Sequence, residues 1–323
     1  MTRAGQAGTH EEQAANAVAM ARSVQALLAA GWDTVLVHGN GPQVGSLAIQ
    51  QEEGAGRVPA QPLFALGAMT QGQLGSLLSL ALHQPAPGRK GAVSVVTHSV
   101  VDPADPAFAH PTKPIGPFFT AEEAERLAAS QGWTVQEDAG RGWRRVVPSP
   151  EPVAILEADA IGALAEAGYL VVAAGGGGVP VVPSRDGYRG VDAVIDKDYA
   201  AEVLATGLGA RALVLVTSVE SVLLDYGTPG QRAIEEIHVA EAERHLADGQ
   251  FPEGSMAPKV RAAIRFLRSG GDVAVITTPG LVYASLEGTV SELEGRSGTR
   301  IVRVHRVRPA SEHPAPVLTG GGR

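Results

Sequence analysis

The sequence contains no cysteine, and only 4% of its residues are aromatic. The absence of cysteine excludes disulfide bonds, thiolate metal sites and a cysteine nucleophile. Apolar runs such as 212–216 are far too short to span a bilayer. The first twenty residues include His10, Glu11 and Glu12, where a signal peptide would be apolar. We therefore expect a cytoplasmic protein that has no membrane partner.

The sequence also has fewer basic than acidic residues. The 26 lysines and arginines are outnumbered by 34 acidic residues, which gives a net charge of -8 and a pI near 5.6. Such a chain has no general attraction for phosphate backbones, so we predict no nucleic-acid partner. With 323 residues, 44% of them hydrophobic, it can bury the core of one large domain or two modest ones.

Short apolar segments alternate with segments of helical periodicity. Residues 11–30 show helical spacing, and 34–37 form a β-branched run that ends at a glycine loop before a second helical stretch, 44–51. Further apolar strands are predicted at 169–174, 213–216 and 273–276. This alternation predicts an α/β fold, a three-layer αβα sandwich with a mainly parallel central sheet. Ligands in such folds bind beyond the carboxyl ends of the strands, where the glycine loops fall.

The pattern changes between residues 102 and 150. Prolines are so dense at 103–117 that we expect no regular strand there. A charged helix is predicted at 121–130 and a hairpin at 133–147. We interpret about 103–150 as a small protruding subdomain over an active site, within one domain that spans 1–305. Residues 306–323, rich in proline and glycine and without apolar periodicity, are predicted to be a disordered tail.

Two glycine loops are candidates for anion binding. Gly39, Asn40 and Gly41 follow a strand and precede a helix, which suits an anion, although a tight turn explains them equally well. Four consecutive glycines, 175–178, cost more conformational entropy than a turn requires. This indicates that something approaches the backbone closely there, with a flexible linker as the alternative.

Two segments place lysine at the start of a helix. In the first, Lys197 is flanked by Asp196 and Asp198, which could fix its charge for phosphoryl transfer or simply form a solvated helix start. In the second, Lys259 opposes the helix dipole, so it is either exposed or directed at an anion. His38, His83 and His98 lack metal-ligand spacing and are interpreted as structural or surface residues.

Seven stretches resemble the carbamate kinases, a family within the wider amino-acid kinases. They are HGNGPQVG (38–45), AMTQG (68–72), TKPIGPF (112–118), EDAGRGWR (137–144), GGGGVP (175–180), VIDKD (194–198) and GSMAPK (254–259). The resemblance covers about residues 5–303. The stretches that begin at Lys113 and Glu137 are particular to the carbamate kinases.

The resemblance implies a mainly parallel eight-stranded sheet, a protruding subdomain, a homodimer and Mg²⁺ with ATP or ADP as cofactors. The implied reaction is ATP + carbamate = ADP + carbamoyl phosphate. The family usually runs it in reverse during arginine fermentation, making ATP after arginine deiminase and ornithine carbamoyltransferase.

The same resemblance implies roles for individual residues. Lys197 and Lys259 would neutralise the transferring phosphoryl group, Asp198 would hold those lysines, and Lys113 would reach in from the subdomain. The substrate and phosphate site would comprise Gly39, Asn40, Gly41, Gly176, Gly177 and Asp196. The nucleotide would lie near Thr217, Tyr226 and Met256, and no residue is predicted to be a metal ligand.

The chain departs from the family pattern in two places. Carbamate kinases begin with a strand ending in Ala-Leu-Gly-Gly-Asn-Ala, whose loop cradles the phosphates, whereas this chain starts with sequence that matches the region after that loop, about a dozen residues further along. We expect unpaired neighbouring strands, low stability and little activity, and interpret the gap as a start codon assigned too far downstream. The second departure is Glu220, where relatives more often carry aspartate.

Two alternatives stay open at this stage. Another amino-acid kinase, acting on acetylglutamate or aspartate, would need an arginine or serine pocket for a second carboxylate, and the sequence shows no motif for one. A non-catalytic partner that keeps only the dimer surface is favoured by the missing loop, but the lysines at 113, 197 and 259 count against it.

Overall fold

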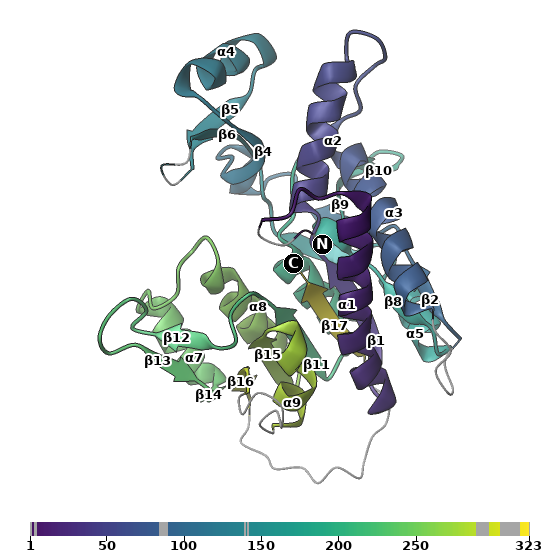
Figure 1. Cartoon of the computed structure of the whole chain (residues 1–323), viewed down its shortest axis with the longest axis vertical. Helices are drawn as coiled ribbons and strands as arrows, with labels where there is room; N and C mark the ends of the chain where they lie inside the picture. The colour runs from purple at the N-terminus through teal and green to yellow at the C-terminus, as the bar shows by residue number, and fades with distance from the viewer. Residues whose placement is uncertain are drawn as a thin grey trace.

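An eight-stranded sheet forms the centre of the structure, a computed structural model that describes residues 2, 5–83, 90–138, 140, 142–288, 297–303 and, as backbone, 317–322 (Figure 1). Every neighbouring pair of strands is parallel except β15 and β16. In sheet order the strands are β14 (Glu236–His238), β16 (Thr299–Val302), β15 (Val273–Thr277), β11 (Ala212–Val216), β17 (Val317–Gly322), β1 (Asp33–His38), β8 (Leu170–Val172) and β2 (Ala92–Ser94). The predicted α/β fold with a mainly parallel sheet is confirmed.

Helices cover both faces of this sheet because its strands are apolar on both sides. Successive side chains of a strand point to opposite faces, so Val35 and Val37 of β1 pack in one cluster and Leu36 in another. The first face carries α5 (Ala158–Glu166), α6 (Lys197–Gly207) and α8 (Met256–Arg268), with α7 (Val239–Ala247) against α8. The second carries α1 (His10–Ala29), α3 (Leu63–Leu82) and α9 (Val282–Glu287). The three predicted layers are therefore present.

Two smaller sheets flank the central one. The first has the order β10 (Gly187–Gly190), β9 (Val179–Ser184), β3 (His98–Val101) and β7 (Pro152–Ile155). The second pairs β12 (Val222–Leu224) with β13 (Arg232–Ile234). Short 3₁₀ turns occur at Pro106–Phe108, Gly175–Gly177 and Pro279–Leu281. Within the described residues, no helix has the length and apolar character needed to cross a membrane.

A three-stranded sheet with one helix projects from the body, at the upper left of Figure 1. It consists of β4 (Lys113–Phe119), β6 (Trp143–Val147), β5 (Thr134–Glu137) and α4 (Ala121–Gln131). Our expectation of no strand in the proline-rich stretch is wrong for β4. This strand lies at the sheet edge, and its pairing with β6 shifts register between Ile115 and Phe119, which is where proline is tolerated. β4 contacts α2 (Gly41–Gly54), which anchors the projection beside the glycine loop of β1.

The C-terminal strand β17 was not predicted. It runs parallel to β1 on one side and to β11 on the other, between them in the sheet. The expected disordered tail, 306–323, therefore does not hold for 317–322, while 306–316 and 323 lie outside the described residues. The expectation that neighbouring strands would be left unpaired is wrong for the same reason, because β17 supplies ladder partners to both.

Candidate active site

A cavity of about 390 Å³ opens where β1 and β8 end, as expected for ligands of a parallel sheet. Its described lining is Thr2, Gly39, Asn40, Gly41, Pro42, Val44, Lys113, Pro114, Ile115, Arg144, Gly176, Val194, Ile195, Asp196, Lys197, Asp198, Gly254, Ser255, Pro258 and Lys259. All four predicted catalytic residues are in this set, and so are five of the six predicted substrate residues. The subdomain closes one side of the cavity through Lys113 and Arg144.

Lysine is concentrated at this cavity. The chain has only four lysines, and most of its positive charge comes from arginine. Three of these four lysines line the cavity. The fourth, Lys90, precedes β2 and stacks on the ring of Tyr169. Lysine is a compact point charge, whereas arginine is a planar fork. The cavity therefore collects most of the chain's compact ammonium charges.

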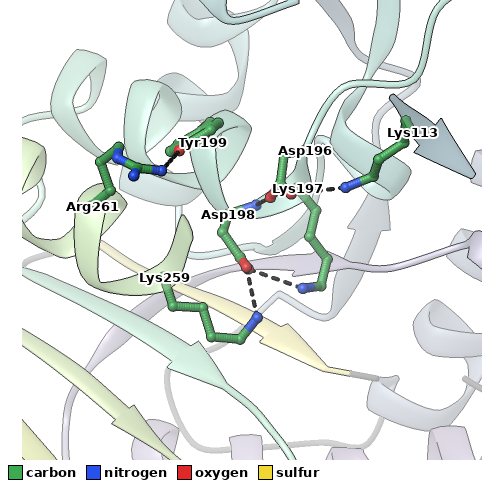
Figure 2. A network of polar contacts seen from close by, with 7 residues as sticks. All are labelled: Lys113, Asp196, Lys197, Asp198, Tyr199, Lys259 and Arg261. Atoms are coloured by element: carbon green, nitrogen blue, oxygen red, sulfur yellow. Dashed lines mark hydrogen bonds and ion pairs between the residues drawn. The ribbon is translucent and has the colours of Figure 1, made fainter. Parts of the chain in front are cut away.

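Asp198 joins two of these lysines (Figure 2). Lys197 Nζ donates to Asp198 Oδ1 at 2.9 Å, and Lys259 Nζ donates to Asp198 Oδ2 at 2.8 Å. The three side chains are 13%, 5% and 2% exposed for Lys197, Asp198 and Lys259. A buried cation is costly unless it is paired, and the carboxylate provides that pairing for both ammonium groups. The sequence left open whether Lys259 is exposed, and the structure shows that it is buried against Asp198.

Asp196 connects this cluster to the subdomain. One oxygen accepts a hydrogen bond from the backbone N–H of Asp198 at 2.9 Å, which caps α6, and the other accepts from Lys113 Nζ at 2.9 Å. Three ammonium groups thus face two carboxylates, which leaves an excess of one positive charge at the cavity. An anionic ligand would compensate that charge.

The protonation of Asp198 is set by two opposing effects. Burial on its own raises the pKa of this carboxyl, but the ammonium groups of Lys197 and Lys259 outweigh it and lower the pKa from 3.8 to about 2. The carboxylate is therefore charged at neutral pH, and it holds the two lysines in one geometry.

Three helices begin at the cavity. The residues that line it include Gly41 of α2, Lys197 of α6, and Ser255 and Pro258 at the start of α8. The N-terminus of a helix carries partial positive charge and backbone N–H groups that bind anions. Helices α2 and α8 have no side-chain cap there. Together with the lysines, these termini make the cavity suited to a phosphate group.

The loop after β1 is fixed by Asn40. Its Nδ2 donates to Thr70 Oγ1 of α3 at 2.8 Å, and the side chain is buried. The backbone carbonyl of Asn40 accepts from the N–H of Val44, which opens α2. Asn40 therefore joins a strand, a loop and a helix in one position at the cavity wall.

The four glycines at 175–178 are needed because protein groups approach them closely. Gly176 has φ +66°, and a Cβ there would overlap the amide of Asn40. A Cβ at Gly175 would overlap the ring of His38, and one at Gly177 the carbonyl of Ile195. The predicted close approach is thus present, made by side chains and backbone of neighbouring loops. Gly177 itself is not among the described lining residues, and its carbonyl accepts from Ser99 Oγ at 2.6 Å.

The predicted nucleotide residues lie outside the lining of this cavity. Thr217 follows β11 and donates its N–H to the carbonyl of Thr277. Tyr226 is exposed beyond β12, and Met256 begins α8 next to the lining residue Ser255. Their role in nucleotide binding stays a prediction.

Arg144 and Thr2 were not assigned roles from the sequence. Arg144 donates to the carbonyl of Gly116 from Nε and Nη2 and pairs with Asp138 at 3.1 Å, which stiffens the subdomain wall. Thr2 Oγ1 accepts from Gln43 Nε2 at 3.1 Å. Arg144 belongs to the family-like stretch 137–144, so the sequence could have indicated it. Thr2 lies in none of the seven stretches.

The chain is similar to known proteins over most of its length. Residues 5–278 match the model of the amino acid kinase family. The chain is 44% identical over 302 residues to the carbamate kinase of Pyrococcus horikoshii, covering 92% of this chain and 94% of that protein. It is 46% identical over 305 residues to the carbamate kinase of Thermococcus kodakarensis, covering 93% and 95%.

The chain is also similar to a solved structure. The carbamate kinase from Giardia lamblia bound to AMP-PNP superposes with a TM-score of 0.84 at 40% identity. The match covers 94% of this chain and 95% of that one.

Proposed function

The chain belongs to the amino acid kinase family, where it groups with the carbamate kinases as a phosphotransferase, and we propose that it transfers a phosphoryl group between ATP and carbamate. The reaction is ATP + carbamate = ADP + carbamoyl phosphate. The observation that carries the proposal is the buried Lys197–Asp198–Lys259 cluster at the starts of α6 and α8.

The cluster suits the chemistry of the step. A carbamate oxygen attacks the terminal phosphorus of ATP while the bond to the bridging oxygen of ADP breaks, so negative charge moves across the phosphoryl oxygens. Fixed cations in a partly dry site stabilise that charge without reorganisation. Lys197 and Lys259 provide the cations, Asp198 keeps them in place, and Lys113 adds a third from the subdomain.

The cavity also fits the polyphosphate of a nucleotide. It combines the three lysines with the N-termini of three helices, and both are typical phosphate-binding elements. The two carboxylates already accept hydrogen bonds from lysines. We therefore propose that Mg²⁺ would be held mainly by the nucleotide phosphates, where it would neutralise charge on the leaving group.

Several finer predictions rest on the resemblance to carbamate kinases. They are ATP synthesis in arginine catabolism, a cytoplasmic location and a homodimer. Each stays a proposal. The cluster favours a catalyst over a non-catalytic partner, because an assembly of three lysines and two acids around one cavity has no need to persist in a chain that only dimerises.

The test is phosphorylation of ADP by carbamoyl phosphate in the presence of Mg²⁺. The sequence predicted little activity because neighbouring strands would be unpaired, but β17 pairs with both β1 and β11. We therefore expect turnover by the unmodified chain, a loss of about 10²- to 10³-fold in kcat for Lys259→Met, and normal turnover for Lys90→Met. Lys90 is a matched control because it is the lysine remote from the cavity. Phosphorylation of acetylglutamate or aspartate by ATP, with none of carbamate, would overturn the proposal in favour of another amino-acid kinase. No transfer by a folded chain would favour a non-catalytic partner.

A further inference from the structure

Helices α6 and α8 are joined by a second contact, beside the pair of Asp198 with Lys259. Arg261 Nη1 donates to the hydroxyl oxygen of Tyr199 at 3.0 Å. Figure 2 shows this contact to one side of the lysine cluster. Tyr199 follows Asp198 directly in α6, and Arg261 lies two residues beyond Lys259 in α8. The two contacts are therefore close together along both helices.

The second contact restricts how the two helices can move. The pair of Asp198 with Lys259 is a single link, about which the starts of the helices would be free to rotate. A second link beside it removes that rotation. Because Lys197 is carried by α6 and Lys259 by α8, the orientation of the helices sets the separation of the two ammonium groups. Cations stabilise a transferring phosphoryl group only when they are held in the productive geometry.

Arg261 also holds the loop before α8. Its Nη2 donates to both carboxylate oxygens of Glu253, at 3.1 and 3.3 Å. The next two residues, Gly254 and Ser255, line the cavity, and Ser255 gives α8 no side-chain cap. A guanidinium is a planar fork that can donate in several fixed directions at once. One side chain thus connects α6, through Tyr199, with the segment that leads into the first turn of α8.

The ring of Tyr199 is held independently of its hydroxyl group. It packs against the main core cluster of the sheet. The guanidinium of Arg265 lies over the ring, 5.2 Å from its centroid, and Arg265 Nη2 donates to Glu151 Oε2 at 2.8 Å. A phenylalanine at this position would keep these ring contacts and remove only the acceptor for Arg261.

We propose that Tyr199 and Arg261 are positioning residues for phosphoryl transfer, which with Glu253 form a clamp that holds the start of α8, and so Lys259, against α6. Neither Tyr199 nor Arg261 is among the described residues that line the cavity, so both act through the lysine cluster. The effect of the clamp on rate rests on the proposed function, whereas its effect on the loop before α8 does not.

The kinetic test uses two substitutions in the full chain, assayed by phosphorylation of ADP from carbamoyl phosphate. We expect Tyr199→Phe and Arg261→Met each to lower kcat about 5- to 20-fold, because Lys259 is displaced from its place in the cluster. The matched controls should keep normal kcat. Tyr283→Phe removes the hydroxyl of an exposed tyrosine on α9, and Arg268→Met breaks an exposed pair farther along α8.

Dependence on the cluster is tested in a Lys259→Met background. If Tyr199 acts by positioning Lys259, then Tyr199→Phe should lower kcat by less than about twofold in this background. A loss of folded protein would instead lower kcat by the same factor in both backgrounds. Circular dichroism checks the fold, and Lys259→Gln provides the background if Lys259→Met does not fold.

The clamp itself is tested by hydrogen exchange, which requires no turnover. The amides of residues 255–257 donate to the carbonyl of Pro252, so they are protected while the loop is held. We expect them to exchange at least about tenfold faster in Arg261→Met than in Arg268→Met, measured by mass spectrometry of peptides.

The outcomes separate the clamp from the proposed function. Faster exchange in Arg261→Met, with a smaller loss of kcat in the Lys259→Met background, supports the positioning role. The same factor in both backgrounds overturns that role. If the unmodified chain transfers nothing from carbamoyl phosphate, the proposed function fails, while faster exchange still supports the clamp. Equal exchange in Arg261→Met and Arg268→Met overturns the clamp, whatever the turnover.

Discussion

Lys259 Nζ lies 2.8 Å from Asp198 Oδ2, and this buried pair ties the first turn of α8 to the first turn of α6. The two helices lie on the same face of the sheet, and each contributes one lysine to the lining of the cavity. Since Asp198 also holds Lys197, a single carboxylate sets the geometry of both cations.

Replacing Asp198 by asparagine should affect stability and activity together. The change leaves Lys197 and Lys259 with no carboxylate between them, and breaking a buried ion pair typically costs about 3–5 kcal/mol. We expect a comparable loss in the free energy of unfolding, measured with urea, and loss of turnover. The control is Asp272→Asn, which breaks the exposed pair with Arg211 and should cost less than about 1 kcal/mol. Equal stability of the two variants would contradict the role assigned to Asp198.

Replacing Lys113 should lower activity with little effect on stability. Its side chain is 36% exposed and comes from the projecting subdomain, so its pair with Asp196 contributes about 1 kcal/mol or less. Its charge nevertheless faces the cavity. We expect Lys113→Ala to lower kcat/KM for carbamoyl phosphate by about 10- to 100-fold while the urea midpoint stays nearly unchanged. A large fall in the midpoint with unchanged kinetics would make Lys113 a structural residue.

Gly176→Ala should damage the cavity wall through Asn40. The new Cβ overlaps the Asn40 amide, and the positive φ adds strain. The matched control is Gly132→Ala, at φ +68° with no neighbour to meet the Cβ, so it carries the strain alone. We expect about 1–3 kcal/mol of extra destabilisation and a clear loss of turnover for Gly176→Ala. Equal destabilisation and equal turnover of the two variants would show that neither stability nor turnover depends on the close approach of Asn40.

Much of the site could be predicted because its elements are local. The strand and loop before α2, the glycine run and the Asp196–Asp198 triplet each carry a pattern of neighbouring residues, and the parallel sheet brings them to one edge. The predicted helix at 11–30 corresponds to α1, which begins with a capping box between Thr9 and Glu12. The scarcity of lysine is a signal that the prediction did not use, since three of only four lysines line the cavity.

The C-terminal strand could not be predicted in the same way. Glycine has low strand propensity, and the segment 317–322 ends in three glycines after a proline-rich stretch. What places it in the sheet is the pairing offered by β1 and β11, which are more than 100 residues away along the chain. Pairing of this kind depends on tertiary structure, so no pattern within the segment reveals it.

Stability should also fall on mild acidification because of His38. Burial lowers the pKa of His38 from 6.5 to about 4, so the folded chain keeps a neutral imidazole while the unfolded chain protonates it. The unfolded state therefore binds more protons between pH 6.5 and pH 4, and the contribution of His38 is complete above this window and is lost as the pH falls through it. This contribution of His38 to the free energy of unfolding is about 3 kcal/mol. Asp198 titrates below this window, because its pKa is lowered to about 2.

Urea unfolding at about pH 7, 5.5 and 4.5 measures this effect. We expect the unmodified chain to lose stability across the series and His38→Gln to lose clearly less, since the variant has no imidazole to protonate. His110→Gln, which changes an exposed histidine, controls for the removal of a ring and should follow the unmodified chain. The same pH dependence in His38→Gln and the unmodified chain would show that other groups cause the acid sensitivity, and that His38 is not held neutral by burial.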